Sequence, residues 1–395
     1  MNTDETISTF VTFFRNRGHQ PIVSSSLLSP PGDPVLFTSA GMHPLTPYLT
    51  GQPHPLGRRL TGVQRCLRTT DLDEVGDDSH LTVFQMLGSW SLDDYGGPRS
   101  LRWGLELLRD GFGLTRELLY ATVFGGDEQT GPDVSAQQTW SELGLPVELL
   151  GPEDNWWSNG PVGPCGPDSE IHVWTGDGPP SGSPSTDARW LELWNHVTMC
   201  YERHPDGRLA PARQPGVDTG MGLERLLMVT QHVRSVYETD LFEPWLSVLP
   251  SLWLTDSRSL RILTDHLRSA IVVIGDGVRP SNTGRGYVLR RLLRRALTTL
   301  WRGDQGSSRS LSDLPPDLVR HTAGRFGQVI ELSLVTGTLA AEERRFRELV
   351  SRGQSLLERL YPSGRLTEDD YEFLRDTHGL PRELITELLG DYAGS

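Results

Sequence analysis

The segment 217–225, with the sequence VDTGMGLER, places a carboxylate, two glycines and a cation within nine residues. It predicts a strand that turns into a helix, because Gly220 and Gly222 allow a close backbone approach that any Cβ would block. Asp218 offers an acceptor for an ammonium group. Arg225 offers a planar charged group that pairs with phosphate or stacks on a flat base. Taken alone, the segment fits either a ligand site or a purely structural turn.

Composition excludes several classes of protein. The chain has 395 residues, enough for two packed domains, and its 42 glycines and 28 prolines favour a loop-rich α+β enzyme over a helical bundle. No run approaches the roughly 18 apolar residues of a membrane span, and no secretion signal opens the chain, so no membrane partner is expected. The cysteines, Cys66, Cys165 and Cys200, are far apart and form no CxxC pair. We therefore expect a reduced cytoplasmic protein with no disulfide and no metal site built by cysteine.

Lysine is absent, so all 37 basic residues are arginine. This excludes a P-loop lysine, a pyridoxal Schiff base and the lysine of protein kinases. Any phosphate chemistry would depend on arginine, backbone amides and metal ions. The formal charge of −14 argues against indiscriminate nucleic-acid binding, because phosphate contacts need local positive charge, but it leaves room for a local basic island.

Hydrophobic patterning divides the chain into a strand-rich part and a helical part. Residues 60–68 and 80–92 carry strand-like patterns joined by a polar turn, whereas helical patterning dominates from Leu223 onward. We place the change near residue 240, which gives the domains 1–240 and 241–395.

Several further motifs occur in a fixed order before and after the segment 217–225. Together they resemble the alanyl-tRNA synthetase family over nearly the whole chain, and so many ordered motifs are far more specific than one pattern. The motifs are FTSAGM (37–42), QRCLR (64–68), TVFQMLGSWSLDDYG (82–96), GPCGPDSEI (163–171), WNHVTM (194–199), LTDHLRSAIVVIGDGVRPSN (263–282), RGYVLRRLLRR (285–295) and RDTHGLP (375–381).

The resemblance implies an α+β fold, in which a class II synthetase core, an antiparallel sheet flanked by helices, is followed by a helical tRNA-recognition domain. Residues 1–240 would bind ATP and alanine, and residues 241–395 would recognise the acceptor. The chain is similar to a truncated form that lacks the family's editing and carboxy-terminal domains. A monomer is expected on this basis, because the dimer-forming portion of the family is among the missing parts.

The resemblance also implies ATP-dependent formation of alanyl-adenylate, with Mg²⁺ accompanying ATP. Arg68 would hold the α-phosphate and the attacking carboxylate. Arg225 would reach the γ-phosphate and cover one face of adenine, while Phe84 covers the other. The ATP site would include Gly222 and Gln85, which stands where the family has a glutamate. No metal ligand is assigned from spacing.

For the amino acid, the resemblance makes Asp218 the acceptor of the ammonium group of L-alanine. Strand alternation places Asn195 and Val197 on one face and His196 on the other, so His196 is expected to pack rather than act as a base. Only one of two adjacent tryptophans, 156 and 157, can face the pocket. The alanine-binding residues implied are Met42, Trp157, Asn195, Val197, Asp218 and Gly220.

The acceptor half is less well defined. Arginines at 290, 291, 294 and 295 follow helical spacing and predict a basic face, unless nearby acidic residues neutralise it. Gly284 stands where the family has a base-reading asparagine, and the loop after Arg68 is short. The acceptor-binding residues implied are Arg285, Arg291, Arg295 and Asp376.

Three hypotheses for function follow. The first is a ligase that activates alanine and charges tRNA without editing. The second makes the same adenylate but transfers alanine to a small molecule, such as a nucleoside, in specialised metabolism. The third, a regulatory or RNA-binding paralogue, conflicts with the retention of Arg68, Phe84, Asp218 and Arg225 together.

Overall fold

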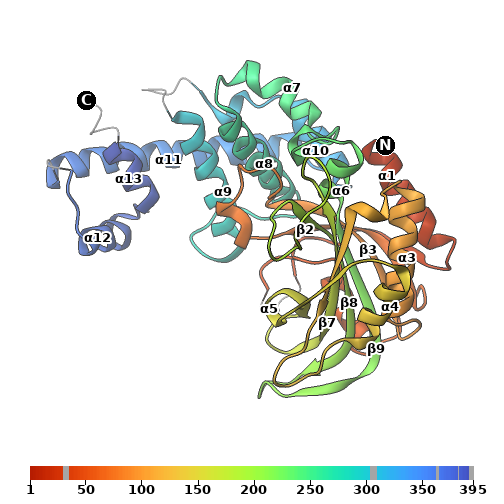
Figure 1. The fold of residues 1–395 in the computed structure, drawn as a ribbon. Coiled ribbons are helices and arrows are strands. Elements are labelled where there is room, and N and C mark those ends of the chain that lie inside the picture. Colours follow the sequence, from red (N-terminus) through yellow and green to blue (C-terminus); the bar gives the residue numbers. More distant parts are fainter. Residues whose placement is uncertain (30–34, 303–308, 362–363, 381, 391–395) are drawn as a thin grey trace. The chain divides into compact units, whose positions relative to one another are not determined.

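The computed structural model describes residues 1–29, 35–302, 309–361, 364–380 and 382–390 (Figure 1). The chain divides into two compact units, Met1–Ser247 and Val248–Ser395. Helix α7 (Glu243–Leu252) runs through the boundary. The division therefore falls a few residues after the change near residue 240 that the sequence patterning suggested.

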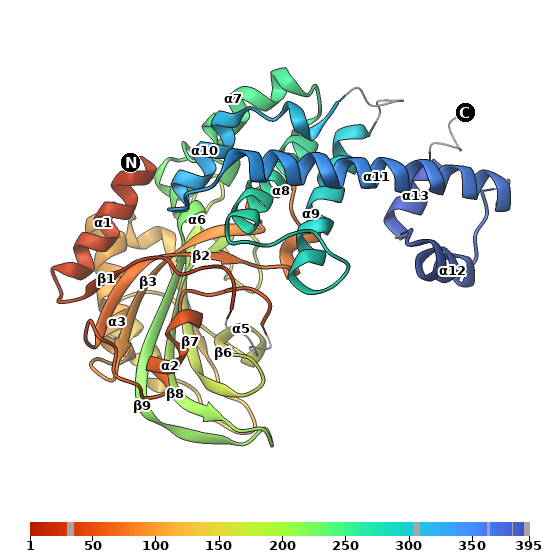
Figure 2. The same cartoon turned by 180° about the vertical axis from the view of Figure 1, so that it is seen from behind.

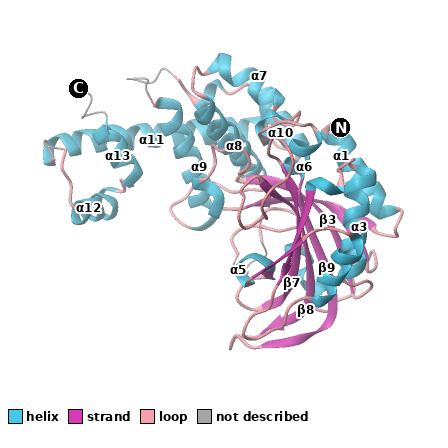
Figure 3. Cartoon of the chain, in the orientation of Figure 1, coloured by secondary structure: helices cyan, strands magenta, loops and turns pink. Residues whose placement is uncertain are grey.

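The first unit is built on one sheet of nine strands. Its strands follow the order β1-β2-β3-β9-β8-β7-β4-β5, with β6 paired to β7, and Figure 3 shows them gathered in one layer. The strands are β1 (Gln20–Ile22), β2 (Arg59–Leu67), β3 (Val83–Leu92), β4 (Leu119–Phe124), β5 (Val147–Leu150), β6 (Trp156–Ser158), β7 (Gly163–Trp174), β8 (Trp190–Arg203) and β9 (Leu209–Gly222).

The sheet is antiparallel in its centre and parallel at both edges. The pairs β1–β2 and β4–β5 are parallel, and the other strand pairs are antiparallel. The connection from β4 to β5 contains a helix, which returns the chain to run in the same direction. The expected antiparallel sheet is confirmed for the centre and corrected to a mixed sheet at the edges.

Helices cover one face of this sheet with a continuous apolar core. Phe10 and Phe14, Leu101 and Trp140 pack there with strand residues such as Trp194. The opposite face carries a smaller apolar cluster. The helices of this unit are α1 (Thr3–Arg15), α2 (Thr46–Leu49), α3 (Gly97–Glu106), α4 (Val134–Leu143), α5 (Pro152–Asn155) and α6 (Leu223–Thr230).

The second unit is helical in its described residues, and Figure 2 shows α11 as its longest helix. Leu289, Leu292, Leu293 and Ala296 of α9 are buried, as their helical spacing predicted. None of the helices in the described part of the chain has the length and apolarity needed to cross a lipid bilayer. The helices are α8 (Ser257–Gly275), α9 (Gly284–Trp301), α10 (Pro316–Arg325), α11 (Leu332–Leu360), α12 (Glu368–His378) and α13 (Arg382–Gly390).

Trp90 lies along its own strand on the face opposite the helices. A Cβ built at Gly88 would lie 2.2 Å from Cζ2 of this indole, and one at Gly41 would lie 2.9 Å from the same atom. Residues two apart on a strand share a face, so Gly88 is the position that the ring must cross. The missing side chains at these two glycines therefore allow the Trp90 ring to lie flat.

We predict that Gly88→Ala lowers the free energy of unfolding by about 1–3 kcal/mol, because the added methyl group displaces the Trp90 ring. Thermal or urea unfolding measures the change. Gly131→Ala is the matched control, since no atom lies within 4 Å of its added Cβ. Equal stability of the two variants would contradict the packing described for Trp90.

Candidate functional site

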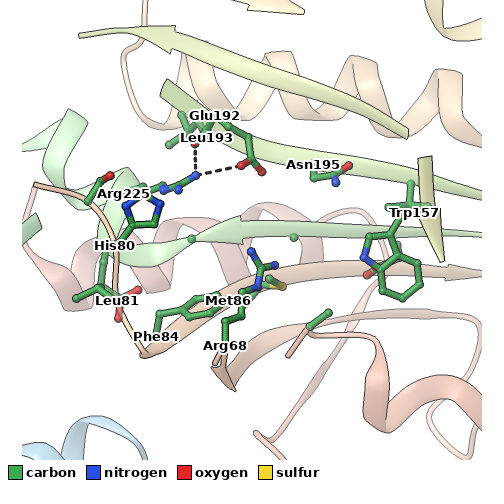
Figure 4. Close-up of a pocket in the computed structure, with 17 residues that line it drawn as sticks. Arg68, His80, Leu81, Phe84, Met86, Trp157, Glu192, Leu193, Asn195 and Arg225 are labelled. Atoms are coloured by element: carbon green, nitrogen blue, oxygen red, sulfur yellow. Dashed lines mark hydrogen bonds and ion pairs between the residues drawn. The ribbon is translucent and has the colours of Figure 1, made fainter. Parts of the chain in front are cut away.

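A pocket opens on the sheet face opposite the helices (Figure 4). Nine of the eleven residues that the sequence assigned to ATP and alanine line it. They are Arg68, Phe84, Trp157, Asn195, Val197, Asp218, Gly220, Gly222 and Arg225. The sequence interpretation did not name the other lining residues, among them His80, Met86, Glu192 and Glu224.

Strand register explains why residues so distant in sequence converge. Asp218 of β9 is paired with Trp90 of β3 on one side and with Val197 of β8 on the other. Gly220 is likewise paired with Asn195. Paired residues in antiparallel strands point to the same face, with Cβ atoms roughly 4.5–5.5 Å apart. The central strands therefore present these side chains side by side at the pocket.

Asp218 is a buried carboxylate held by an indole. Its side chain is 6% exposed, and Nε1 of Trp90 donates a hydrogen bond of 2.7 Å to its Oδ1. Burial raises the pKa of Asp218 to about 7, and the bond from Trp90 opposes this rise only in part. A cation that enters the pocket would restore the charged form, because an opposite charge nearby favours ionisation.

Arginine side chains occupy the other part of the pocket. The guanidinium carbon of Arg68 lies 5.2 Å from the centre of the Phe84 ring, and its Nε donates to the carbonyl of Ser39 at 3.3 Å. Nη1 of Arg225 donates to the carboxylate and to the backbone carbonyl of Glu192, both at 3.0 Å. Figure 4 shows both contacts.

The charge of Glu192 is stabilised by these cations. Desolvation raises the pKa of Glu192, but the charges of Arg225 and Arg68 outweigh it, so the pKa lies below its ordinary value. Two of the carboxylates that line the pocket therefore differ: the charge of Glu192 is stabilised by arginines, whereas the charge of Asp218 is disfavoured by burial. Such divergent environments are typical of functional sites.

Two predicted site residues, Met42 and Gln85, do not line the pocket. Met42 is fully buried in the smaller apolar cluster, just before a short 3-10 helix (His43–Leu45). Gln85 lies between Phe84 and Met86 on β3, so strand alternation turns its side chain to the other face. Its backbone N–H donates to both carboxylate oxygens of Glu224, at 3.1 Å each.

His196 and Trp157 lie where the sequence placed them, while their roles stay predictions. His196 faces the helices, where its Nδ1 and the hydroxyl of Ser100 lie 2.8 Å apart, and burial lowers its pKa to about 3. Of the adjacent tryptophans, Trp157 lines the pocket, whereas Trp156 packs near Phe124. His196 thus lies outside the pocket lining, among buried residues.

Comparisons with known proteins identify the family of the chain. The family described as tRNA synthetases class II (A) matches residues 5–393. The chain is 40% identical to the alanine–tRNA ligase of Treponema pallidum (strain Nichols), over 98% of this chain and 68% of that protein. The chain belongs to the alanyl-tRNA synthetase family.

Other alanine–tRNA ligases are similarly identical over nearly the whole of this chain. The alanine–tRNA ligase of Rubrobacter xylanophilus is 40% identical over 99% of this chain, and that of Borrelia hermsii is 37% identical over 100%. The chain spans only 47% and 70% of their respective lengths. The pyrrolysyl-tRNA synthetase of Desulfitobacterium hafniense has a TM-score of 0.32 at 15% identity, over 60% of this chain and 71% of that one, a likeness too weak to carry an argument.

The residues that the sequence predicted to bind the acceptor lie in the helical unit. The arginines at 290, 291, 294 and 295 of α9 do not form the single exposed basic face that the sequence predicted. Arg290 and Arg294 pair with the buried Glu342 of α11, at 3.1 and 3.0 Å. Burial lowers the pKa of His266 on α8, and the charges of Arg295 and Arg291 lower it further.

The two remaining acceptor-binding residues differ in exposure. Arg285 is half-buried at the start of α9. Asp376 is exposed on α12 and accepts a bond of 2.8 Å from its neighbour Arg375. Their assignment to an acceptor stem stays a prediction, from the basic face of the helix for Arg285 and from the family for Asp376.

Asp218 gives a pH-dependent prediction for stability. Its pKa rises on folding from 3.8 to about 7. Between these values the folded protein retains a proton that the unfolded chain has lost, so this contribution to stability is present at low pH and is lost as the pH rises through about 7. The difference in unfolding free energy between Asp218→Asn and the unmodified protein should therefore shift by about 1–3 kcal/mol in favour of Asp218→Asn from pH 5 to pH 8.

Urea unfolding at both pH values measures this shift. Asp177→Asn, a change at an exposed carboxylate, is the control and should show no such shift. A difference that stays constant with pH for Asp218→Asn would show that this carboxylate is not buried as described.

Proposed function

We propose that this chain activates L-alanine with ATP, forming alanyl-adenylate and pyrophosphate, and transfers the alanyl group to tRNA. One observation carries the proposal. Arg68, Phe84, and the pair Asp218 and Arg225, which come from three separate segments, line a single pocket in a chain of the alanyl-tRNA synthetase family. Alanine–tRNA ligases are the relatives that match over nearly all of its length.

The order of groups along the pocket suits this reaction. In Figure 4 Trp157 and Asn195 lie at one end, Arg225 and His80 at the other, and Arg68 between them. Alanine would occupy the first end, with its ammonium on the nearby Asp218. The triphosphate would extend towards Arg225. The alanine carboxylate and the α-phosphate then meet beside Arg68.

The chemistry needs little more than this placement. The carboxylate oxygen attacks the α-phosphorus, the bond to the bridging oxygen breaks, and pyrophosphate leaves. Negative charge builds on the phosphoryl oxygens during this step, and a fixed guanidinium stabilises it. Phe84 would support the adenine by stacking, and Arg225 would neutralise the departing phosphates.

Mg²⁺ would accompany the triphosphate, because it is commonly bound through one or two carboxylates together with substrate phosphates. Glu192 fits this role, since it lines the pocket and its pKa lies below the ordinary value. Among the described residues, no cluster of three or more His, Cys, Asp or Glu side chains could hold a metal ion by itself. The phosphates of ATP would thus supply the remaining ligands.

Charge distribution favours tRNA as the acceptor. The unit Val248–Ser395 holds 21 of the 37 arginines and 19 of the 51 acidic residues, a net charge of +2, whereas Met1–Ser247 carries −16. A polyanion would be repelled less by the helical unit than by the strongly acidic catalytic one. The alternative of a small-molecule acceptor has no comparable observation in its favour. We expect activity in the cytoplasm, where tRNA and ATP are found.

Arg68→Ala should reduce kcat for alanine-dependent exchange of pyrophosphate into ATP by about 100- to 1,000-fold, because the charge that stabilises the α-phosphate is lost. Arg234→Ala is the control, since Arg234 is 86% exposed and lies outside the pocket. Absence of exchange in the unmodified enzyme would refute the proposed function. Undiminished exchange in Arg68→Ala would refute the role of Arg68 alone.

Phe84→Leu should raise KM for ATP about 3- to 10-fold, because stacking on the base contributes roughly 0.5–1.5 kcal/mol beyond the area buried. KM for alanine serves as the internal control and should stay within about two-fold. Both values come from the same exchange assay. A rise in KM for alanine with none for ATP would place adenine elsewhere.

Incubation with alanine, ATP and tRNA specific for alanine should yield aminoacylated tRNA, which acid gel electrophoresis detects. Rapid pyrophosphate exchange together with uncharged tRNA would contradict the tRNA acceptor. That result would direct the search to small molecules that carry an amine or a sulfamate.

A further inference from the structure

We propose that Asp168 is a positioning residue for the amino-acid end of the pocket, which fixes the side-chain amide of Asn195 so that its oxygen is available to the ammonium group of the substrate. The inference rests on the proposed function, because it concerns how alanine is bound. Neither composition nor family resemblance assigned Asp168 a role.

Asp168 lies on β7, opposite Val197 of β8, and is 3% exposed. Its Oδ2 accepts from Nδ2 of Asn195 at 3.3 Å, and its Oδ1 accepts from Nδ2 of Asn155 at 3.0 Å. Nδ2 of Asn155 also donates to the hydroxyl of Thr122, at 3.1 Å. Each oxygen of the buried carboxylate is thus matched to one amide donor.

This arrangement selects one of two orientations of the Asn195 amide. An amide that turns by half a rotation exchanges its oxygen and its NH₂ group at almost no cost in shape. In its ionised form the carboxylate of Asp168 can only accept, so it holds the NH₂ group of Asn195 towards itself. Burial raises the pKa of Asp168 to about 7, and the bonds from Asn155 and Asn195 oppose this rise because they favour the ionised form.

The oxygen of Asn195 is consequently left without a partner. Oδ1 is buried and has no hydrogen-bond partner among the described residues, although Asn195 lines the pocket. A buried acceptor without a donor is unfavourable, so such an atom at a binding site indicates a ligand that donates. An ammonium group donates and does not accept. The turned amide would instead present its NH₂ group to the cation.

Strand register places Asp168 and Asn195 close to Asp218. Asp168 is paired with Val197 across β7 and β8, and Val197 is paired with Asp218 across β8 and β9. The two carboxylates therefore flank Val197 in one row on one face of the sheet. Asp218 would meet the ammonium group directly, and Asp168 would act on it through Asn195.

Asp168→Ala should raise KM for alanine about 10-fold in the pyrophosphate-exchange assay and leave KM for ATP within about two-fold. Asn195→Ala should raise KM for alanine at least as much. The decisive variant is the double one, Asp168→Ala with Asn195→Ala. Because Asp168 acts through Asn195, the double variant should show no further rise beyond Asn195→Ala.

Ser169→Ala is the matched control. Ser169 is the next residue of β7 and is equally buried, but its hydroxyl accepts from the indole of Trp140 and donates to the backbone carbonyl of Thr122, not to Asp168 or Asn195. This variant should lose stability without a change in KM for alanine. Asp168→Asn keeps the volume of the side chain and offers only one acceptor oxygen, so it should fold and raise KM for alanine by a smaller factor than Asp168→Ala.

The outcomes separate two failures. If the unmodified enzyme shows no alanine-dependent exchange, the proposed function fails and this inference falls with it. If the unmodified enzyme is active but both Asp168 variants retain its KM for alanine, only the positioning role is overturned. A double variant whose KM for alanine rises as the product of the two single effects would likewise overturn it, because Asp168 would then act independently of Asn195.

Discussion

The register of β9 between β3 and β8 is the constraint on which the site depends. It aligns Trp90, Asp218 and Val197 in one row, and Gly88, Gly220 and Asn195 in the next. A shift of one residue in either pairing would turn Asp218 to the face covered by helices. The same alignment requires small residues at Gly88, where a Cβ would meet the Trp90 ring, and at Gly220, where a Cβ would lie 2.7 Å from the sulfur of Met86. The fold thus sets the site through strand pairing.

Burial disfavours the charged form of Asp218, and a bound cation would remove that disadvantage. Asp218 has one hydrogen-bond donor in Trp90 and a raised pKa, so its carboxylate is poorly stabilised until a cation arrives. Glu192 and Arg225 stabilise one another in the same pocket. A cation bound at Asp218 would therefore stabilise the charge of that carboxylate. A polyanion bound at Arg225 would instead replace Glu192 as the partner of that arginine. This asymmetry suits a pocket that holds a small ammonium compound and a polyanion together.

The resemblance to a known family supplied the candidate site residues, and strand alternation predicted the facing of those on β8, because a period of two can be read directly from the sequence. Asn195, Val197 and His196 fell on the faces that a period of two requires. The same rule, applied to β3, would have placed Met86, Gly88 and Trp90 on the face of Phe84 and turned Gln85 away. Trp90 could have been found in this way. Asp168 could not, because its role depends on a pairing between β7 and β8 that no local pattern reveals.

The helical unit shows a different limit of sequence reasoning. Arginines spaced along α9 predicted a basic face, but the buried Glu342 of α11 pairs with Arg290 and Arg294, and nothing local to α9 signals that partner. Parallel pairing at the sheet edges was missed for a similar reason, because it depends on how a connection returns the chain. Whether an arginine is paired with an acid, and whether two strands run in parallel, depends on segments distant in sequence. Which face of a strand a side chain points to depends only on local alternation.

The most direct test of the account is a crystal structure with L-alanine and an ATP analogue whose α,β-bridge cannot be cleaved. The account predicts the ammonium nitrogen at hydrogen-bond distance, ~2.7–3.2 Å, from Asp218, and the α-phosphate beside Arg68. A structure in which alanine or the nucleotide occupies another surface, with Asp218 still bound only to Trp90, would contradict it.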